Sequence, residues 1–261
     1  MRVLVTNDDG VDSAGIRALA VALHARGHDI LVVAPNRDRS GASAAIGPLH
    51  RLDSLPVAEH TWPELPNVRV CAIDAPPATA VFVACLGGFG QPPDVIASGI
   101  NPGANVGHLV LHSGTVGAAL TGAGLGIPGI AVSLALRDQP ASYEPAAALA
   151  GFALDWVVAP RSNNTRPPVH SLNVPNLPLD EIAGIREARL ATFGEAWVAM
   201  SATREGGDLK LEFKGQASEP EPGTDRAFLR DGFATVTALM SVESTPAPGA
   251  ADHIETRYTR A

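Results

Sequence analysis

Short apolar runs and helical repeats alternate along the first two thirds of the chain. Residues 2–6 (RVLVT) and 29–34 (DILVVA) are continuous Val- and Leu-rich runs, as in strands that are buried on both faces. Between them, the apolar positions of residues 13–26 recur at helical spacing, and Gly27 follows as a helix stop. Strand, helix and strand of these lengths predict a right-handed βαβ unit, and therefore a parallel sheet.

The same alternation continues to about residue 180. Further strands are expected at 68–73, 94–98, 129–134 and 169–174, and further helices at 77–86, 114–125 and 144–158. Residues 36–66 are polar and contain prolines, and we expect them to be irregular. The pattern predicts an α/β fold, with a mostly parallel sheet flanked by helices over residues 1–180.

The pattern changes after residue 180. Residues 209–214 (LKLEFK) alternate between apolar and charged side chains, and residues 196–203 do so in part. A Gly-Gly turn separates these two segments, so we expect a β-hairpin extension here.

A Pro/Gly-rich loop at 216–225 and one more strand at 232–239 are expected to follow the hairpin. Residues 181–245 are therefore interpreted as a hairpin-and-strand extension. The polar tail at 246–261 is expected to be flexible or to contact a partner.

Composition narrows the class of protein. The length of 261 residues, with 46% apolar residues, suits one large α/β domain, alone or with a small appendage. We find neither an apolar run long enough for a membrane span nor a signal-peptide pattern, so we expect a cytoplasmic protein. The net charge of -8 and the lack of a basic run disfavour a nucleic-acid polymer as partner. Cys71 and Cys85 are expected to be buried free thiols.

Oxygen-bearing side chains follow three strands of the predicted sheet. Asp8 and Asp9 follow the first strand, Ser40 lies in the loop after the second, and Asn101 and Asn105 follow the strand at 94–98. Loops at the carboxyl ends of parallel strands open on one edge of the sheet. Such oxygen ligands suit Mg²⁺, Mn²⁺ or Ca²⁺ better than zinc, and a cation would relieve the repulsion between adjacent carboxylates.

A helix start rich in glycine and hydroxyl groups lies further along the chain. Ser113, Gly114 and Thr115 open the helix predicted at 114–125, and Ser113 is suited to cap it. The free N–H groups of such a start form a site for phosphate. A metal beside a phosphate site indicates metal-assisted hydrolysis of a phosphate ester.

Each of these features has a simpler interpretation when taken alone. Asp9 before Gly10 fits an ordinary turn, and Ser40, Asn101 and Asn105 are common loop residues. The spacing of His108 and His112 is that of a helical zinc pair, but the flanking glycines favour a loop. A nicotinamide-dependent oxidoreductase is disfavoured because no Gly-x-Gly-x-x-Gly motif follows the first strand.

Four motifs in order favour the metal-site interpretation. The segments VTNDDGVDSAGIRAL, VVAPNRDRSGAS, SGINPGANVG and HSGTVGAA resemble the successive motifs of the SurE family of survival-protein 5′/3′-nucleotidases. The later segments NVPNLPLDEIAGIR and PGTDRAFLRDGFATVTAL are also similar to that family, so the resemblance runs to about residue 240. It implies a divalent-metal phosphatase that acts on nucleoside monophosphates as a homodimer or homotetramer. It also implies a Rossmann-like core over residues 1–180 and an oligomerisation role for the hairpin extension at 181–245.

The resemblance also implies roles for individual residues. Asp8, Asp9, Ser40 and Asn101 match the ligands of one Mg²⁺ or Mn²⁺ ion per subunit. Asn105, with the Ser113-Gly114-Thr115 helix start, matches the phosphate-binding side. Asp8, Asp9 and Asn105 are then the candidate catalytic residues, and either aspartate would orient or deprotonate the attacking water.

Four positions depart from the family pattern. His112 stands where members usually have tyrosine, and Leu109 and Thr121 replace acidic residues. Ala78 replaces an aspartate. Changes around a metal site alter activity or affinity by roughly 10–100-fold. The alternative function is therefore a divergent paralogue that binds nucleotide or phosphate without efficient turnover, or with redirected turnover.

Overall fold

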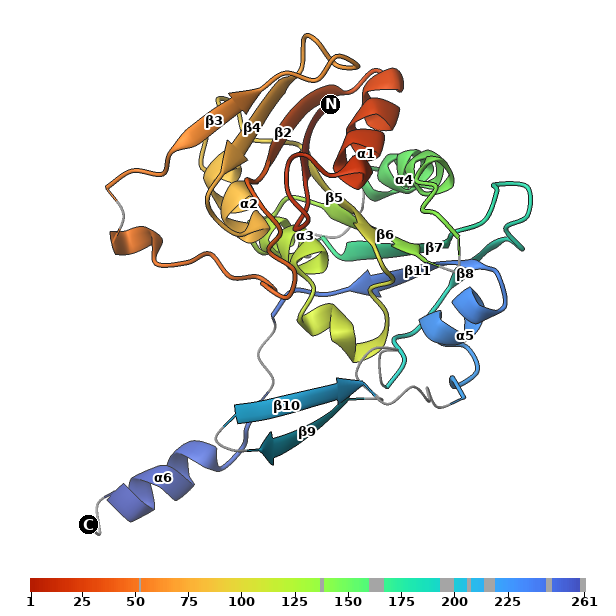
Figure 1. Ribbon diagram of the computed structural model, residues 1–261. Helices are drawn as coiled ribbons and strands as arrows, with labels where there is room; N and C mark the ends of the chain where they lie inside the picture. Colours follow the sequence, from red (N-terminus) through yellow and green to blue (C-terminus); the bar gives the residue numbers. More distant parts are fainter. Residues whose placement is uncertain are drawn as a thin grey trace.

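A nine-stranded sheet forms the centre of the described part of the molecule (Figure 1), in the order β3-β4-β2-β1-β5-β6-β7-β11-β8. This architecture comes from a computed structural model, which describes residues 1–51, 53–136, 139–159, 167–192, 200–205, 208–213, 219–242 and 246–258. The predicted α/β fold with a mostly parallel sheet is confirmed, because only the pairs β3–β4 and β7–β11 of this sheet are antiparallel.

The strands of this sheet are β1 (Arg2–Thr6), β2 (Asp29–Pro35), β3 (Val57–His60), β4 (Arg69–Ile73), β5 (Val95–Pro102), β6 (Gly129–Ala135), β7 (Val169–Pro175), β8 (Ile185–Glu187) and β11 (Ala234–Leu239). Six of them match strands that the apolar runs predict in the first 180 residues. The parallel register between β1 and β5 pairs Thr6 with Ser98, so both strands end at the same edge of the sheet.

Helices cover both faces of the sheet. The helices α1 (Ala14–Ala25) and α4 (Glu144–Val157) pack together on one face, and α2 (Pro77–Cys85) and α3 (Gly114–Gly124) pack together on the other. Successive β1 residues serve opposite cores: Val3 and Val5 pack with the α1/α4 side, and Leu4 packs with the α2 side. Burial on both faces explains why this strand reads as a continuous apolar run.

The segment expected to be irregular contains structure of its own. Within residues 36–66 lie the short 3-10 helix η1 (Leu49–Arg51) and the edge strand β3. The side chains of β3 are exposed or half-buried, so no apolar alternation marks the strand, and pairing with β4 alone defines it. A second 3-10 helix, η2 (Gly107–Leu111), occupies a stretch expected to be a loop.

The C-terminal third contains the predicted hairpin. Its strands are β9 (Met200–Glu205) and β10 (Asp208–Phe213), which pair only with each other among the described residues. Residues 196–199 of the predicted first strand, the Gly-Gly turn and residues 214–218 lie outside the described residues. In Figure 1 the hairpin stands apart from the nine-stranded sheet, whereas β8 and β11 extend that sheet.

Two helices here were not expected from the sequence. The predicted loop at 216–225 ends in α5 (Asp225–Arg230), whose N-cap Thr224 accepts a hydrogen bond from the Ala227 N–H. The tail contains α6 (Ala250–Tyr258), which extends away from the sheet in Figure 1. Both helices are short, with six and nine residues, so each offers too few apolar positions for a helical repeat to be recognised in the sequence.

The remaining expectations concern cysteines and membrane spans. Cys71 is a buried free thiol, as expected, but Cys85 is only half-buried, because it lies at the end of α2.

Among the helices that the structure describes, none has both the length and the apolar character that crossing a bilayer requires.

Candidate active site

The turn after β1 carries the two adjacent carboxylates. The Asn7 side chain closes this turn, because its Nδ2 donates to the Gly10 carbonyl (3.1 Å) and its Oδ1 accepts from the Gly10 N–H (3.2 Å). Nδ2 also donates to Ser13 Oγ (2.7 Å), at the start of α1. The side chain of Asn7 therefore closes the turn, and the carboxylates of Asp8 and Asp9 are available to other partners.

Asp8 joins three segments at the carboxyl edge of the sheet. Its side chain is buried; Oδ2 accepts from the Gly114 N–H (3.1 Å), and Oδ1 accepts from the Thr115 hydroxyl. Its backbone carbonyl accepts from the Arg39 N–H (2.7 Å), which brings the loop after β2 against the same turn. The first turn of α3 thus fixes the Asp8 carboxylate in one orientation.

In the described structure, one oxygen of the Asp9 carboxylate is buried without a hydrogen bond. Its Oδ2 is buried and has no hydrogen-bond partner. Burial, followed by the charges of Asp8 and Asp38, raises the pKa of Asp9 to about 7, against the opposing effect of its own backbone hydrogen bond. Burial and the Asp9 charge in turn raise the pKa of Tyr143. This uncompensated negative charge, with oxygen donors around it, fits a cation.

Ser40 lies in the loop that packs on this turn. It is exposed, and both its N–H (2.7 Å) and its hydroxyl (2.6 Å) donate to Asp38 Oδ1. These two bonds lower the pKa of Asp38. The structure therefore places Ser40 next to the Asp8 turn, and its oxygen keeps lone pairs for another partner.

Asn101 and Asn105 differ in how they are held. Asn101 lies within β5, opposite Ser133 in the ladder, and its Nδ2 donates to the Gly103 carbonyl (2.7 Å). Asn105 lies in the loop beyond the strand. Its N–H donates to Asn173 Oδ1 (2.8 Å), its carbonyl accepts from Asn173 Nδ2 (3.0 Å), and its own Nδ2 donates to Ser133 Oγ (2.9 Å).

The start of α3 has both expected and unexpected contacts. Ser113 caps the helix, as predicted, by accepting from the Val116 N–H (3.1 Å). The Gly114 N–H and the Thr115 hydroxyl, predicted to face phosphate, donate instead to Asp8. The phosphate role of these residues stays a prediction, and the structure adds that they orient a carboxylate.

Sequence reasoning missed several residues that support this site. Asn7 had a detectable signal, because an asparagine three residues before a glycine favours a side-chain-closed turn. Asp38, Ser133 and Asn173 had none, because their importance depends on contacts across the fold.

The four departures from the family pattern lie in different environments. Ala78 is fully buried in α2, and the Thr121 hydroxyl donates back to the Gly117 carbonyl of its own helix (2.7 Å). Leu109 is half-buried within η2, and His112 is exposed at its C-terminal end. Within the described residues, no three or more His, Cys, Asp or Glu side chains are grouped so that they could hold a metal.

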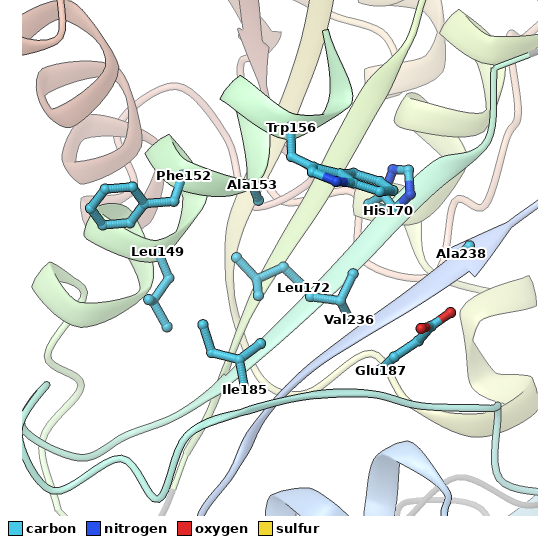
Figure 2. A pocket seen from close by; sticks show the side chains of 10 residues that line it. All are labelled: Leu149, Phe152, Ala153, Trp156, His170, Leu172, Ile185, Glu187, Val236 and Ala238. Atoms are coloured by element: carbon cyan, nitrogen blue, oxygen red, sulfur yellow. The ribbon is translucent and has the colours of Figure 1, made fainter. Parts of the chain in front are cut away.

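A separate apolar hollow of about 480 Å³ lies between α4 and the β7–β11–β8 part of the sheet (Figure 2). Its walls include Leu149, Phe152, Trp156, His170, Ile185 and Val236. Trp156 and His170 meet edge to face, with ring centroids 4.7 Å apart. Neither Asp8 nor Asp9 lines this hollow, and its apolar walls do not suit a phosphate ester, so the carboxyl-edge site is the better candidate.

A family model described as Survival protein SurE matches residues 3–196 of the chain. The chain belongs to the SurE family. SurE relatives include the 5′-nucleotidase SurE of Stenotrophomonas maltophilia (strain K279a), which is 36% identical over 249 residues, covering 92% of this chain and 90% of that protein. The 5′-nucleotidase SurE of Xanthomonas campestris pv. campestris (strain B100) is also 36% identical, covering 92% and 89%.

The fold agrees with this SurE membership. The crystal structure of the SurE protein from Aquifex aeolicus aligns over 100% of both chains, with a TM-score of 0.75 and 26% identity. The resemblance found from the four sequence motifs is therefore confirmed at the level of the family and the fold.

Proposed function

We propose that this SurE-family chain is a divalent-metal-dependent phosphatase that hydrolyses nucleoside 5′- and 3′-monophosphates. The observation that carries the proposal is the buried Oδ2 of Asp9, which has no hydrogen-bond partner and lies next to Asp8 in the chain. The strands β2 and β5 end at the same edge of the sheet, and the loops after them begin there. The 5′-nucleotidase relatives supply the substrate class.

Asp8, Asp9, Ser40 and Asn101 would hold one Mg²⁺ or Mn²⁺ ion per subunit, and Ca²⁺ suits the same oxygens. In Asn101 the amide nitrogen is bonded to Gly103, so the amide oxygen is the atom for a cation. When bound, such an ion supplies Lewis-acid stabilisation of the phosphoryl oxygens and lowers the pKa of water.

The chain's own residues divide the remaining work. Asp8 is held in one orientation through both oxygens by the start of α3, at the edge of the sheet. Asp9 has a free, buried oxygen, so we assign it to orient the attacking water and to take its proton. Asn105, fixed by Asn173 and Ser133, would hold the phosphate.

Metal binding is expected to weaken as the pH falls. Protons compete with the cation for Asp9, because its pKa of about 7 lies far above the ordinary value of 3.8. From about pH 8 to about pH 6 the affinity for Mn²⁺ is expected to fall roughly tenfold, measured by calorimetry. An affinity that is equal at both pH values would contradict the predicted state of Asp9.

The same shift has a consequence for stability without metal. Because the folded-state pKa is raised, protonation of Asp9 favours the folded state, and this contribution is lost as the pH rises through about 7. Added Mn²⁺ is therefore expected to raise Tm more at about pH 8 than at about pH 6.

Phosphate release from a panel of nucleoside 5′- and 3′-monophosphates, with Mn²⁺, Mg²⁺ or EDTA, tests the function itself. We expect release with either metal and none with EDTA. Metal and nucleotide binding without release from any substrate would reject the phosphatase and favour the binding paralogue that the positions Ala78, Leu109, His112 and Thr121 suggest. Release that persists in EDTA would reject the metal dependence.

We also propose that the hairpin β9–β10 mediates assembly into a homodimer or homotetramer. An isolated two-stranded hairpin is only marginally stable in water, and β9 and β10 form a sheet of their own, so a second copy would supply the missing packing. The cytoplasmic location expected from the sequence also remains a prediction.

A further inference from the structure

Asp225, the first residue of α5, is a fully buried carboxylate far along the chain from the site. Three backbone N–H groups donate to it: Gly107 to Oδ2 (2.7 Å), and Ala191 (3.0 Å) and Arg226 (2.8 Å) to Oδ1. Burial of a carboxylate is costly unless its oxygens are hydrogen-bonded. These bonds therefore tie two distant segments, at Gly107 and Ala191, to the start of α5.

Gly107 connects Asp225 to the site. Gly107 is two residues beyond Asn105, and it begins η2 with a φ of 56°. Its buried N–H group donates to Asp225 Oδ2. The loop around Asn105 is thus held at two points, by Asn173 at Asn105 itself and by Asp225 at Gly107. Both holding side chains come from later parts of the chain.

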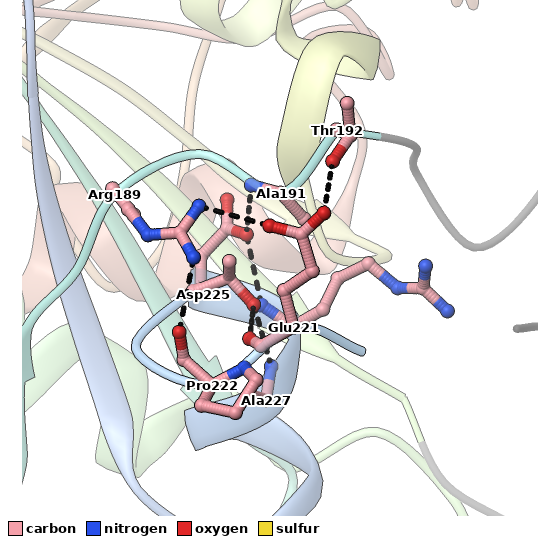
Figure 3. A network of polar contacts seen from close by, with 9 residues as sticks. Arg189, Ala191, Thr192, Glu221, Pro222, Asp225 and Ala227 are labelled. Atoms are coloured by element: carbon pink, nitrogen blue, oxygen red, sulfur yellow. Dashed lines mark hydrogen bonds and ion pairs between the residues drawn. The ribbon is translucent and has the colours of Figure 1, made fainter. Parts of the chain in front are cut away.

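Ala191 connects Asp225 to the segment that leads towards the hairpin. Figure 3 shows this region, where Arg189 Nη1 donates to Glu221 Oε2 (3.1 Å) and the Thr192 hydroxyl donates to Glu221 Oε1 (2.8 Å). The Asp225 N–H also donates to the Arg189 carbonyl (3.0 Å). Asp225 therefore lies where the Asn105 loop meets residues 189–192.

We propose that Asp225 is a positioning residue that fixes the Asn105 loop through Gly107 and ties this loop to residues 189–192. The inference rests on the proposed function for the role of Asn105. It also separates substrate binding from metal binding. The proposed metal ligand Asn101 lies within β5 and is held by the sheet, whereas the proposed phosphate-binding residue Asn105 lies in the loop beyond the strand. Since Asp225 holds only this loop, it governs substrate binding and not metal binding.

Asp225→Asn tests this separation. The variant keeps the shape of the side chain but turns an NH₂ group towards one of the donating N–H groups. We expect KM for a nucleoside monophosphate to rise at least about tenfold while Mn²⁺ affinity changes by less than about twofold. Hydrogen exchange in residues 103–113 is expected to quicken at least about tenfold, with β1 unchanged.

Asp231→Asn is the matched control. Asp231 caps the C-terminal end of the same helix, is exposed and pairs with Arg230 (2.9 Å), so its replacement is expected to change none of these quantities.

Two results would overturn the proposal. One is an unchanged KM with unchanged exchange in the loop. The other is a parallel loss of metal affinity with faster exchange throughout the chain, because this would make Asp225 a general folding residue.

The hydrogen-exchange measurement stays decisive in two further cases. If the wild-type protein releases no phosphate, the proposed function fails, and exchange in residues 103–113 alone decides whether Asp225 holds the loop. If Asp225→Asn does not fold, amide exchange in the wild-type protein decides: protection of the Gly107 N–H by at least about a hundredfold supports the proposal, and free exchange overturns it.

Discussion

Asp8→Asn is expected to reduce phosphate release from nucleoside monophosphates by at least about a thousandfold, a loss of about 4 kcal/mol of transition-state stabilisation. The change removes a negative charge from the proposed metal site. It also places an NH₂ group against the Gly114 N–H or the Thr115 hydroxyl, which now donate to the two Asp8 oxygens. Steady-state kinetics and Mn²⁺ titration are the measurements.

The fold is expected to survive this change. Without metal, Asp8→Asn removes the repulsion that helps to raise the pKa of Asp9, so Tm is expected to stay close to that of the wild type. Asp29→Asn is the matched control, because Asp29 is exposed at the start of β2, at the opposite edge of the sheet. Unchanged turnover in a folded Asp8→Asn protein would remove Asp8 from the site.

Gly114→Ala is expected to lower kcat/KM by roughly 10–100-fold. A methyl group at this position would lie 2.7 Å from Asp8 Oδ2 and 2.8 Å from Asp8 Cβ, so the carboxylate must shift from its present orientation. Alanine favours a helix over glycine by about 1 kcal/mol, so a weaker α3 would not explain the loss. We expect kcat/KM and the affinity for Mn²⁺ to fall together, measured by steady-state kinetics and by Mn²⁺ titration.

Gly124→Ala in the same helix is the control for this prediction. Its added methyl group would meet only Ser241 Oγ, at 3.6 Å, which is an ordinary contact. We expect full activity in Gly124→Ala. Equal activity in Gly114→Ala would show that catalysis does not depend on the present orientation of Asp8.

The candidate site was predictable in part. Asp8, Asp9 and Ser40 follow strands, and Asn101 lies near the end of one. The apolar runs of these strands are visible in the sequence, so the parallel-sheet rule alone predicts that the four residues meet at one edge. The helix start at Ser113 was also visible, but its partner was not. The sequence around Gly114 and Thr115 does not indicate whether their N–H and hydroxyl groups donate to a phosphate or to Asp8.

By itself, the sequence determined the α/β architecture, the strand ends that carry the candidate residues, and the hairpin. Each of these leaves a local pattern: a continuous apolar run for a buried strand, helical spacing for an amphipathic helix, and apolar–charged alternation for the hairpin. Only the tertiary structure decided which groups meet. Asp8 meets Gly114, Asn105 meets Asn173 and Gly107 meets Asp225, across 106, 68 and 118 positions of the chain. Strand order and helix packing select these partners, and no local pattern encodes that selection.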